Sequence, residues 1–167
     1  QTDNGRIYMA HDKTVWATEL YQYDYVDKTR NYMQFEDEVT MLATVTDGMY
    51  VGTTDAVWFL SGTFGEMRRV KVLSYGALPH SAVITPDDLI MPHQSVTKGA
   101  VLFLSEDGLC VGQDNGTCYN LTHTRVLLPR ARGAVGMVRQ QDGMNTYVGV
   151  LDSGGTPVSG ARFGDYV

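Results

Sequence analysis

The sequence predicts an all-β protein built from repeated antiparallel hairpins. Its 18 Gly and 10 Tyr favour turn-rich β structure, because Gly closes tight turns and Tyr suits half-buried strands. Its apolar runs are short and alternate with polar turns, and no helix of ordinary length is indicated. The clearest example is the stretch 47–62, DGMYVGTTDAVWFLSG, in which two apolar runs flank a polar turn.

This hairpin stretch recurs along the chain. The segment 5–19, GRIYMAHDKTVWATE, aligns with 47–62 at a constant offset of 42 residues, which places Trp16 opposite Trp58 in the alignment. A third copy, 107–122, aligns at a further offset of 60 residues. Repeats of roughly 40 to 50 residues with several strands each are typical of β-propeller blades.

The repeats predict a propeller-like arrangement with a partial or incomplete ring. A blade cannot cover both of its faces by itself and is stabilised by its neighbours. Three blades do not close a ring. Either further blades lie in chain outside this sequence, or the units pack as an open β-sandwich, or several subunits complete the assembly.

The chain divides into two predicted regions. Residues 1–126 form the propeller-like repeat domain. The character of the sequence changes at 127–133, LLPRARG, which reads as a boundary. Residues 127–167 are then a C-terminal β extension that packs on the first region or on a neighbouring subunit.

The individual elements follow from the same patterns. The segment 21–38 is predicted to be an irregular excursion anchored by aromatic residues, because tyrosines alternate there with charged loop residues. The expected strands are 7–9 and 15–17, 39–45, the hairpin 47–62, an outer strand 66–73, 81–84 and 89–91 about a Pro-Asp turn, a central strand 100–104, the hairpin 107–122, and 134–139 and 146–151.

Charge limits the classes of partner. The net charge is −6, and the excess of acids lies before residue 61, where ten acids stand against four bases, while the remainder holds nine of each. An acidic balance argues against tight nucleic-acid binding, although it is compatible with lining a path for DNA. No apolar run approaches the roughly 18 residues of a membrane span, and no signal peptide opens the sequence. Because Gln1 stands first, we expect a processed, renumbered or partial chain.

The two cysteines lie in one predicted hairpin. Cys110 and Cys118 flank an Asp-Asn-Gly turn. If the loop is 114–116, Cys110 faces Asn120 and a disulfide does not form. We therefore expect two buried thiols in a reduced compartment.

The sequence contains no recognisable catalytic, cofactor or metal constellation. Its four histidines lack the spacing of a zinc site, and no Ser lies in a nucleophile elbow. Acids at predicted turns could meet at a ring axis as the paired carboxylates of a glycosidase, although acids are ordinary in turns. These acids are Asp24, Asp27, Asp87, Asp88, Asp107 and Asp114.

Two groups of residues are candidates for contacts with other proteins. Tyr21, Tyr23 and Tyr25 would form an exposed aromatic row suited to a protein or glycan, or would instead fill the space between blades. Arg68 and Arg69 lie among three bases within four positions. They could form a phosphate patch, but charges that protect an exposed edge strand are the simpler interpretation.

The order of these motifs resembles tailed-bacteriophage virion structural proteins. In that family a GRIYVA…VLYYSEP hairpin, a Tyr-rich loop and a GLYVGT…VYFL.G hairpin follow one another. Here GRIYMA, YQYDY, GMYVGT and VWFLSG occur in the same order, and GLCVG…NLT fits the later element, so the resemblance covers about residues 4–122.

This resemblance implies a role in assembly and no enzymatic activity. Some of these proteins resemble the propeller-bearing nozzle and tail-stabilisation components below the portal. The implied partners are adaptor, portal-proximal or fibre proteins and further copies in a homo-oligomeric ring, with DNA nearby, in a virion assembled in the bacterial cytoplasm. No active-site residue carries over. The alternative from another class is a carbohydrate-binding or carbohydrate-cleaving propeller module.

Overall fold

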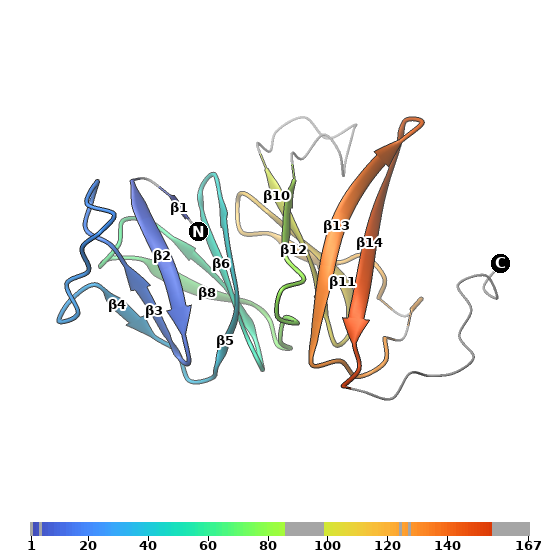
Figure 1. Cartoon of the computed structure of the whole chain (residues 1–167), viewed down its shortest axis with the longest axis horizontal. Coiled ribbons are helices and arrows are strands. Elements are labelled where there is room, and N and C mark those ends of the chain that lie inside the picture. Colours follow the sequence, from blue (N-terminus) through green and yellow to red (C-terminus); the bar gives the residue numbers. More distant parts are fainter. Residues whose placement is uncertain (1, 4, 86–98, 124, 127, 155–167) are drawn as a thin grey trace.

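The computed structural model of the chain describes residues 2–3, 5–85, 99–123, 125–126 and 128–154, and their regular structure is β-strand (Figure 1). The strands are β1 Thr2–Asp3, β2 Arg6–His11, β3 Thr14–Ala17, β4 Tyr32–Gln34, β5 Val39–Val45, β6 Gly48–Thr53, β7 Val57–Ser61, β8 Arg68–Leu73, β9 Val83–Thr85, β10 Ala100–Ser105, β11 Gly108–Gln113, β12 Cys118–Asn120, β13 Gly133–Gln141 and β14 Met144–Asp152. Within the described ranges no helix is long and apolar enough to cross a membrane. The predicted all-β class is confirmed.

The strands form three four-stranded sheets and one hairpin. Sheet 1 has the order β1-β2-β3-β4, sheet 2 the order β5-β6-β7-β8 and sheet 3 the order β9-β10-β11-β12, while β13 and β14 pair as the C-terminal hairpin. Within each sheet, every strand pairs antiparallel with the next one along the chain. Each sheet is therefore a meander with local connections, as the predicted repetition of hairpins requires.

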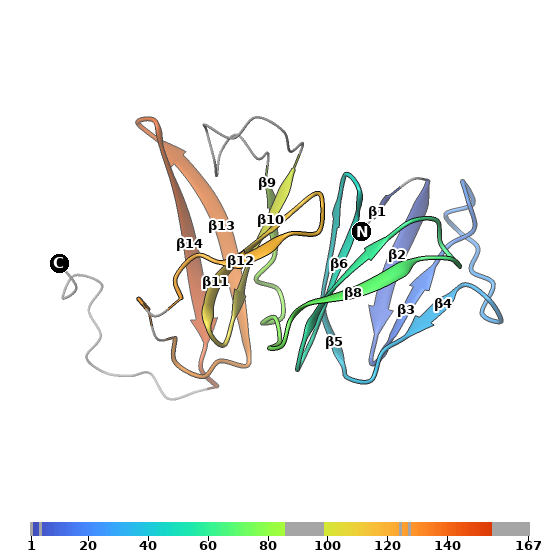
Figure 2. The ribbon, with the colours of Figure 1, turned by 180° about the vertical axis from the view of Figure 1, so that it is seen from behind.

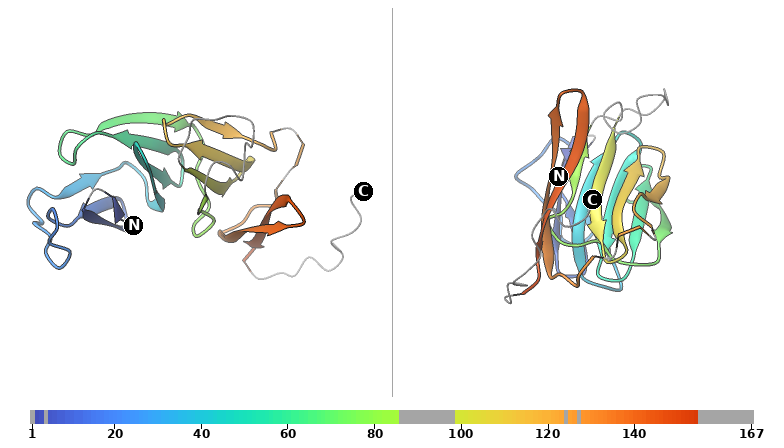
Figure 3. Two further views of the ribbon diagram at one scale, coloured as in Figure 1. Left: turned by 90° about the horizontal axis from the view of Figure 1, so that it is seen from above. Right: turned by 90° about the vertical axis from the view of Figure 1, so that its right-hand side faces the viewer.

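The sheets stack face to face in chain order. Seen from above, they and the C-terminal hairpin follow an open arc (Figure 3). The first strands are neighbours, since β1 contacts β5, β5 contacts β9 and β9 contacts β13. The last strands β8 and β12 lie on the side that faces the viewer in Figure 2, and the first four residues of β8 are exposed.

A separate apolar cluster fills each junction between neighbouring sheets. Sheets 1 and 2 bury Tyr8, Val15, Ala17, Met33, Phe35, Met49, Val51 and Leu60. Sheets 2 and 3 bury Met41, Ala43, Val45, Tyr50, Val57, Phe59, Val101, Phe103 and Cys110. Sheet 3 and the C-terminal hairpin bury Ala100, Leu102, Leu104, Val111 and Ala134, with Tyr147 and Leu151 packed against them.

Tyr50 joins sheets 2 and 3. Its side chain projects from β6 and is fully buried. The hydroxyl donates to the Gln113 carbonyl at 2.6 Å and lies 3.1 Å from the Thr117 carbonyl. Its ring lies 5.0 Å from that of Phe59 and directly over Gly112, where an added Cβ would come within 2.6 Å of the ring. Burial raises the pKa of Tyr50, so the hydroxyl stays a donor.

Tyr147 plays the same part between sheet 3 and the C-terminal hairpin. Its hydroxyl donates to the Ser81 carbonyl at 2.9 Å. A Cβ at Gly136 would lie 2.0 Å from that hydroxyl, so glycine leaves the path open for the ring. Burial raises the pKa of Tyr147 to about 12.

The repeat predicted at an offset of 42 residues is confirmed, and the third copy is also a hairpin, formed by β11 and β12, but it lies one strand later in its sheet. The strands β2 and β6 are both second in their sheets, whereas β11, matched to β6 by sequence, is third in sheet 3. The reason lies in the turns. Thr46-Asp47 joins β5 to β6 and Glu106-Asp107 joins β10 to β11, each as a two-residue connection. Such a turn specifies a hairpin and not its position in a sheet.

Several predicted strands are found as expected. The strand 39–45 is β5, the outer strand 66–73 contains the edge strand β8, and the run 100–104 lies in β10 between β9 and β11. All six residues of β10 are buried. The C-terminal hairpin is longer than expected at both ends, and the proposed boundary at 127 stays a prediction.

Two segments differ from the prediction. The excursion 21–38 is irregular up to residue 31 but ends in β4, because Met33 is buried opposite Val15 and completes sheet 1. The strand expected at 81–84 lies at β9 and pairs with β10. Its expected partner, 89–91, lies outside the described residues.

We expect Gly112→Ala to destabilise the fold by about 1–3 kcal/mol, the usual cost of overpacking a dense interior. The added methyl must displace the Tyr50 ring, whose hydroxyl is fixed at both carbonyls. The measurement is the free energy of unfolding by urea denaturation. Gly99→Ala is the matched control, since nothing lies within 4 Å of its added Cβ. Equal stability of the two variants would contradict the role given to Tyr50.

Candidate functional site

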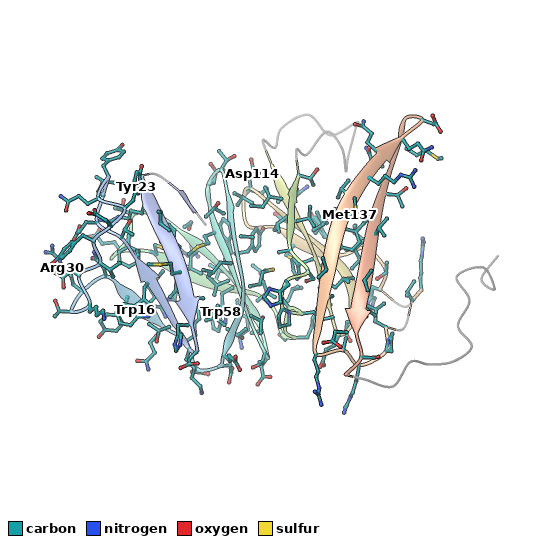
Figure 4. All side chains as sticks on the ribbon, in the orientation of Figure 1. Trp16, Tyr23, Arg30, Trp58, Asp114 and Met137 are labelled. Carbon is teal, nitrogen blue, oxygen red and sulfur yellow. The ribbon has the colours of Figure 1, made fainter. Side chains whose placement is uncertain are left out.

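The three predicted tyrosines lie on one exposed loop, residues 18–31, which we call the tyrosine loop. It joins β3 to β4 at the outer end of sheet 1, where Figure 4 labels Tyr23 and Arg30. Tyr21 is 73% exposed, Tyr23 54% and Tyr25 53%. The alternative that these rings fill the space between sheets is wrong, because all three face solvent. Their role in contacts stays a prediction.

Hydrogen bonds to sheet 1 hold the base of this loop. The Thr18 amide donates to the Ile7 carbonyl at 3.0 Å, and the Ile7 amide donates to the Thr18 hydroxyl at 3.0 Å. The Arg6 guanidinium donates to the Thr18 carbonyl. At the other end of the loop the Asn31 carbonyl accepts from the Ala17 amide of β3 at 3.0 Å. Both ends of the loop are therefore fixed.

Ion pairs cross the loop between these ends. Arg30 Nη2 lies 2.9 Å from a Glu19 carboxylate oxygen, and Arg30 Nε lies 2.9 Å from Asp27. The hydrogen bond from Arg30 lowers the pKa of Glu19, and the hydrogen bonds from Thr29 lower that of Asp27. Because the pKa of each carboxyl is lowered in the folded state, both carboxyls are ionised and both ion pairs are present at any pH above the ordinary carboxyl pKa. They are lost only as the pH falls below about 4.

The backbone of Tyr21 is in the left-handed conformation, and its ring packs against Gly5. Its φ is +58°, in the left-handed region, and its amide donates to the Gly5 carbonyl at 2.8 Å. The ring lies against Gly5, where an added Cβ would come within 2.5 Å of it. The ring thus has one covered face and one face in solvent. Leu20, 49% exposed, adds an apolar side chain beside these rings that no motif of the sequence marks.

A hollow lies beside the loop between sheets 1 and 2. Its volume is about 480 Å³, and Arg6, Leu20, Asp47 and Phe64 are among the residues that line it. The Arg6 guanidinium stacks over Phe64 at 5.3 Å from the ring centroid and lies 3.8 Å from Glu19. The charge of Arg6 is therefore partly balanced within the hollow.

The two predicted arginines do not form one patch. Both lie on the edge strand β8, and side chains alternate between the faces of a strand. Arg69 is held at sheet 1, since Nη1 donates to the Gln34 carbonyl at 2.9 Å and the guanidinium lies 5.2 Å above the Phe35 ring. Arg68 is exposed. The charged edge strand is the interpretation that the structure supports.

The turn carboxylates do not gather. Asp107 directly precedes the six-residue β11 and Asp114 directly follows it, so about 20 Å of strand separates them. Asp24 and Asp27 belong to the tyrosine loop of sheet 1, and residues 87 and 88 lie outside the described ranges. Among the described residues no cluster of His, Cys, Asp or Glu could hold a metal ion.

The cysteines follow the register predicted for them. Cys110 pairs with Asn120, and Cys118 pairs with Gly112. Both thiols are free. Cys110 is buried as expected, whereas Cys118 is only half-buried. Burial raises the pKa of Cys110 and raises that of Cys118 to about 12, so neither thiol ionises readily.

Comparisons with known proteins give this chain no family. No protein-family model matches it, and no curated protein matches it either.

We expect Arg30→Ala to loosen the tyrosine loop without unfolding the sheets. Removing the guanidinium breaks its pairs with Glu19 and Asp27, so the loop opens more often and chymotrypsin should cut after its exposed tyrosines several-fold faster. Lys28→Ala removes the same charge from an exposed position of the loop and is the control. If both variants are cut at the wild-type rate, the ion pairs do not hold the loop.

We expect the two thiols to resist alkylation at pH 8 while the protein is folded. An ordinary thiol is about one-quarter ionised there, whereas a pKa near 12 leaves the thiolate at roughly one part in ten thousand. The rate of reaction with iodoacetamide, followed by mass spectrometry, should rise at least about a hundredfold in denaturant. Rapid labelling of native protein would show that β11 and β12 open readily.

Proposed function

We propose that this chain is a non-enzymatic structural component of a tailed-bacteriophage virion, in the tail or the head-to-tail region. The observation that carries the proposal is the serial stacking of four-stranded meanders whose first strands are neighbours. The order of the hairpins and the Tyr-rich loop in the sequence supports the same assignment. Together they describe a rigid building unit with an exposed loop.

The stacking favours a propeller-like unit over a sandwich of two sheets. In a propeller, meanders of four strands are arranged around a central axis and each packs its faces on its neighbours. The first strands here contact one another in series, and the last strands β8 and β12 lie away from them. An open arc of this kind is one part of such a ring.

The junctions suit a mechanical role. A part that carries load during assembly or DNA passage must keep its sheets in fixed register. Tyr50, fully buried, and Tyr147, half-buried, each bridge two layers through a hydrogen bond from the ring hydroxyl. Replacing such a contact costs stability at a whole junction, because dense interiors transmit strain.

The charge distribution suits a surface that passes DNA without holding it. The acidic excess lies in residues 1–60, from sheet 1 to β7 of sheet 2, and acidic surface repels phosphate. The tyrosine loop is the surface that we assign to a neighbouring virion protein. Tyrosine buries much area at low entropic cost, and a loop fixed in advance loses less freedom on binding.

A carbohydrate-binding module is the second candidate. The observation in its favour is the hollow of about 480 Å³, which is lined by exposed Leu20 and by the ring of Phe64. Aromatic faces next to polar groups are a common form of sugar site. This candidate and the first use the same loop and differ in the partner.

Both candidates are tested by locating the chain and changing the loop. We expect mass spectrometry of purified particles to find it in several copies each, and gold-labelled antibody to mark the tail region. Changing Tyr21, Tyr23 and Tyr25 together to Ser should abolish incorporation while the Tm stays within a few degrees, since all three rings are exposed. Val70→Ser, on exposed β8, is the control.

The contrary outcomes are distinct. Absence of the chain from particles would contradict the virion role. The carbohydrate module would be favoured if the three-tyrosine variant were still incorporated into particles but no longer bound immobilised cell-wall polysaccharide.

A further inference from the structure

We propose that a second copy of this chain docks head to tail, with the outer face of sheet 1 of one copy on the outer face of the C-terminal hairpin of the next. The proposal deepens the proposed function and rests on it for the premise that copies of the chain assemble. It names the two surfaces through which they do so.

The outer face of sheet 1 carries an apolar row. Met9 lies opposite Trp16, and Trp16 lies opposite Tyr32, so the three side chains cross β2, β3 and β4 on one face. The rings of Trp16 and Tyr32 are 5.7 Å apart. Met9 is 44% exposed and Tyr32 46%. The opposite face of the same sheet is covered by sheet 2.

The outer face of the C-terminal hairpin is also apolar. Val135 lies opposite Val150, and Met137 lies opposite Val148. Their exposed fractions are 66% and 69% for the first pair and 56% and 42% for the second. Met144, 69% exposed, extends the face toward the turn. The inner face of this hairpin packs on sheet 3.

These two faces are the ends of one continuous series of interfaces. Sheet 2 buries both of its faces, one on sheet 1 and one on sheet 3, and sheet 3 buries its second face on the hairpin. Figure 4 places Trp16 at one end of the series and Met137 at the other. Sheet 1 of a second copy, laid on the hairpin, would continue the series in the same direction.

Charge favours this pairing of unlike ends. Residues 1–38 contain eight acids and four bases, whereas residues 125–152 contain four bases and two acids. Arg139 lies two positions beyond Met137 on the same face of β13. Two copies of the sheet 1 end would instead bring like charges together, which disfavours a symmetric contact.

The contact is heterologous, because two different patches meet. Such contacts form closed rings when the rotation between copies closes, and open filaments when it does not. Exposed apolar faces of this extent mark interaction sites on soluble proteins. Head-to-tail docking is therefore a route to the homo-oligomeric ring that the resemblance implies, where the rotation between copies closes.

The test is a mixed disulfide between two separately made variants of the full chain. Met9→Cys protein mixed with Met137→Cys protein should give a covalent dimer under mild oxidation, while each variant alone should give little. Tyr32→Cys with Val148→Cys provides a second pair. Val70→Cys, on exposed β8, mixed with either partner is the control. Native Cys110 and Cys118 contribute little, because burial raises the pKa of both thiols.

A second measurement does not depend on disulfide geometry. Val150→Lys adds charge to the hairpin face at a side chain that is 69% exposed, so the fold should persist by circular dichroism. Sedimentation velocity should then show self-association weakened by about tenfold or more relative to the unchanged chain. Val70→Lys should leave it unchanged.

Three results would overturn the proposal. They are a monomer that forms no mixed disulfide with either pair, disulfides that form equally between like variants, and an intramolecular bond in the Met9→Cys, Met137→Cys double variant. None of these results would contradict the virion role, which is tested by the chain's presence in particles. A head-to-tail dimer of a chain absent from particles would leave the docking standing and the virion role contradicted.

Discussion

The central sheets are apolar on both faces, and this constraint governs the rest of the structure. In sheet 2 the residues of β6 are all buried, because successive side chains point to sheet 1 and to sheet 3 in turn. A two-faced sheet cannot stand alone in water, since each buried aliphatic or aromatic side chain contributes roughly 1.5–3 kcal/mol that exposure would lose. Sheets 2 and 3 therefore each need a neighbour on both sides.

At two of the junctions a tyrosine ring packs over a glycine. Tyr50 passes over Gly112, and Tyr147 passes over Gly136. Gly112 lies on β11 across the gap from Tyr50, whereas Gly136 lies on β13 of the same hairpin as Tyr147. In both cases the missing Cβ leaves room for the ring to reach a carbonyl outside its own sheet. The hydrogen bond satisfies a buried hydroxyl that would otherwise cost free energy. Burial of apolar area thus drives the association of the sheets, and the tyrosine hydrogen bond fixes their relative position.

Most of the local structure could be predicted, because it is encoded locally. The apolar run 39–45 and the polar turn after it are enough to define β5 and the hairpin that follows. The register of Cys110 against Asn120 followed from the length of one turn. Sheet order could not be read in the same way. The third copy of the hairpin sits one strand later in its sheet than the first two, since a turn carries no information about the strands beyond it.

The candidate site was only half predictable for a related reason. The Tyr21, Tyr23 and Tyr25 alternation showed which rings to consider, but strand-like alternation and an exposed loop have the same sequence pattern. The loop that carries these rings is crossed by the hydrogen bond from Arg30 to Glu19, eleven residues apart, a contact that no short motif records. The outer faces were missed because Met9 and Val135 look like core residues.

The distribution of apolar groups argues for assembly more than for chemistry. Inside the stack, apolar side chains meet apolar side chains at each junction, and the buried thiols and phenols are held in their neutral forms. Outside it, exposed apolar groups concentrate at the tyrosine loop, on the outer face of sheet 1 and on the outer face of the C-terminal hairpin. The repeated hairpins supply a rigid frame. What distinguishes one hairpin from another, its loop or its free face, is where this chain can meet a partner.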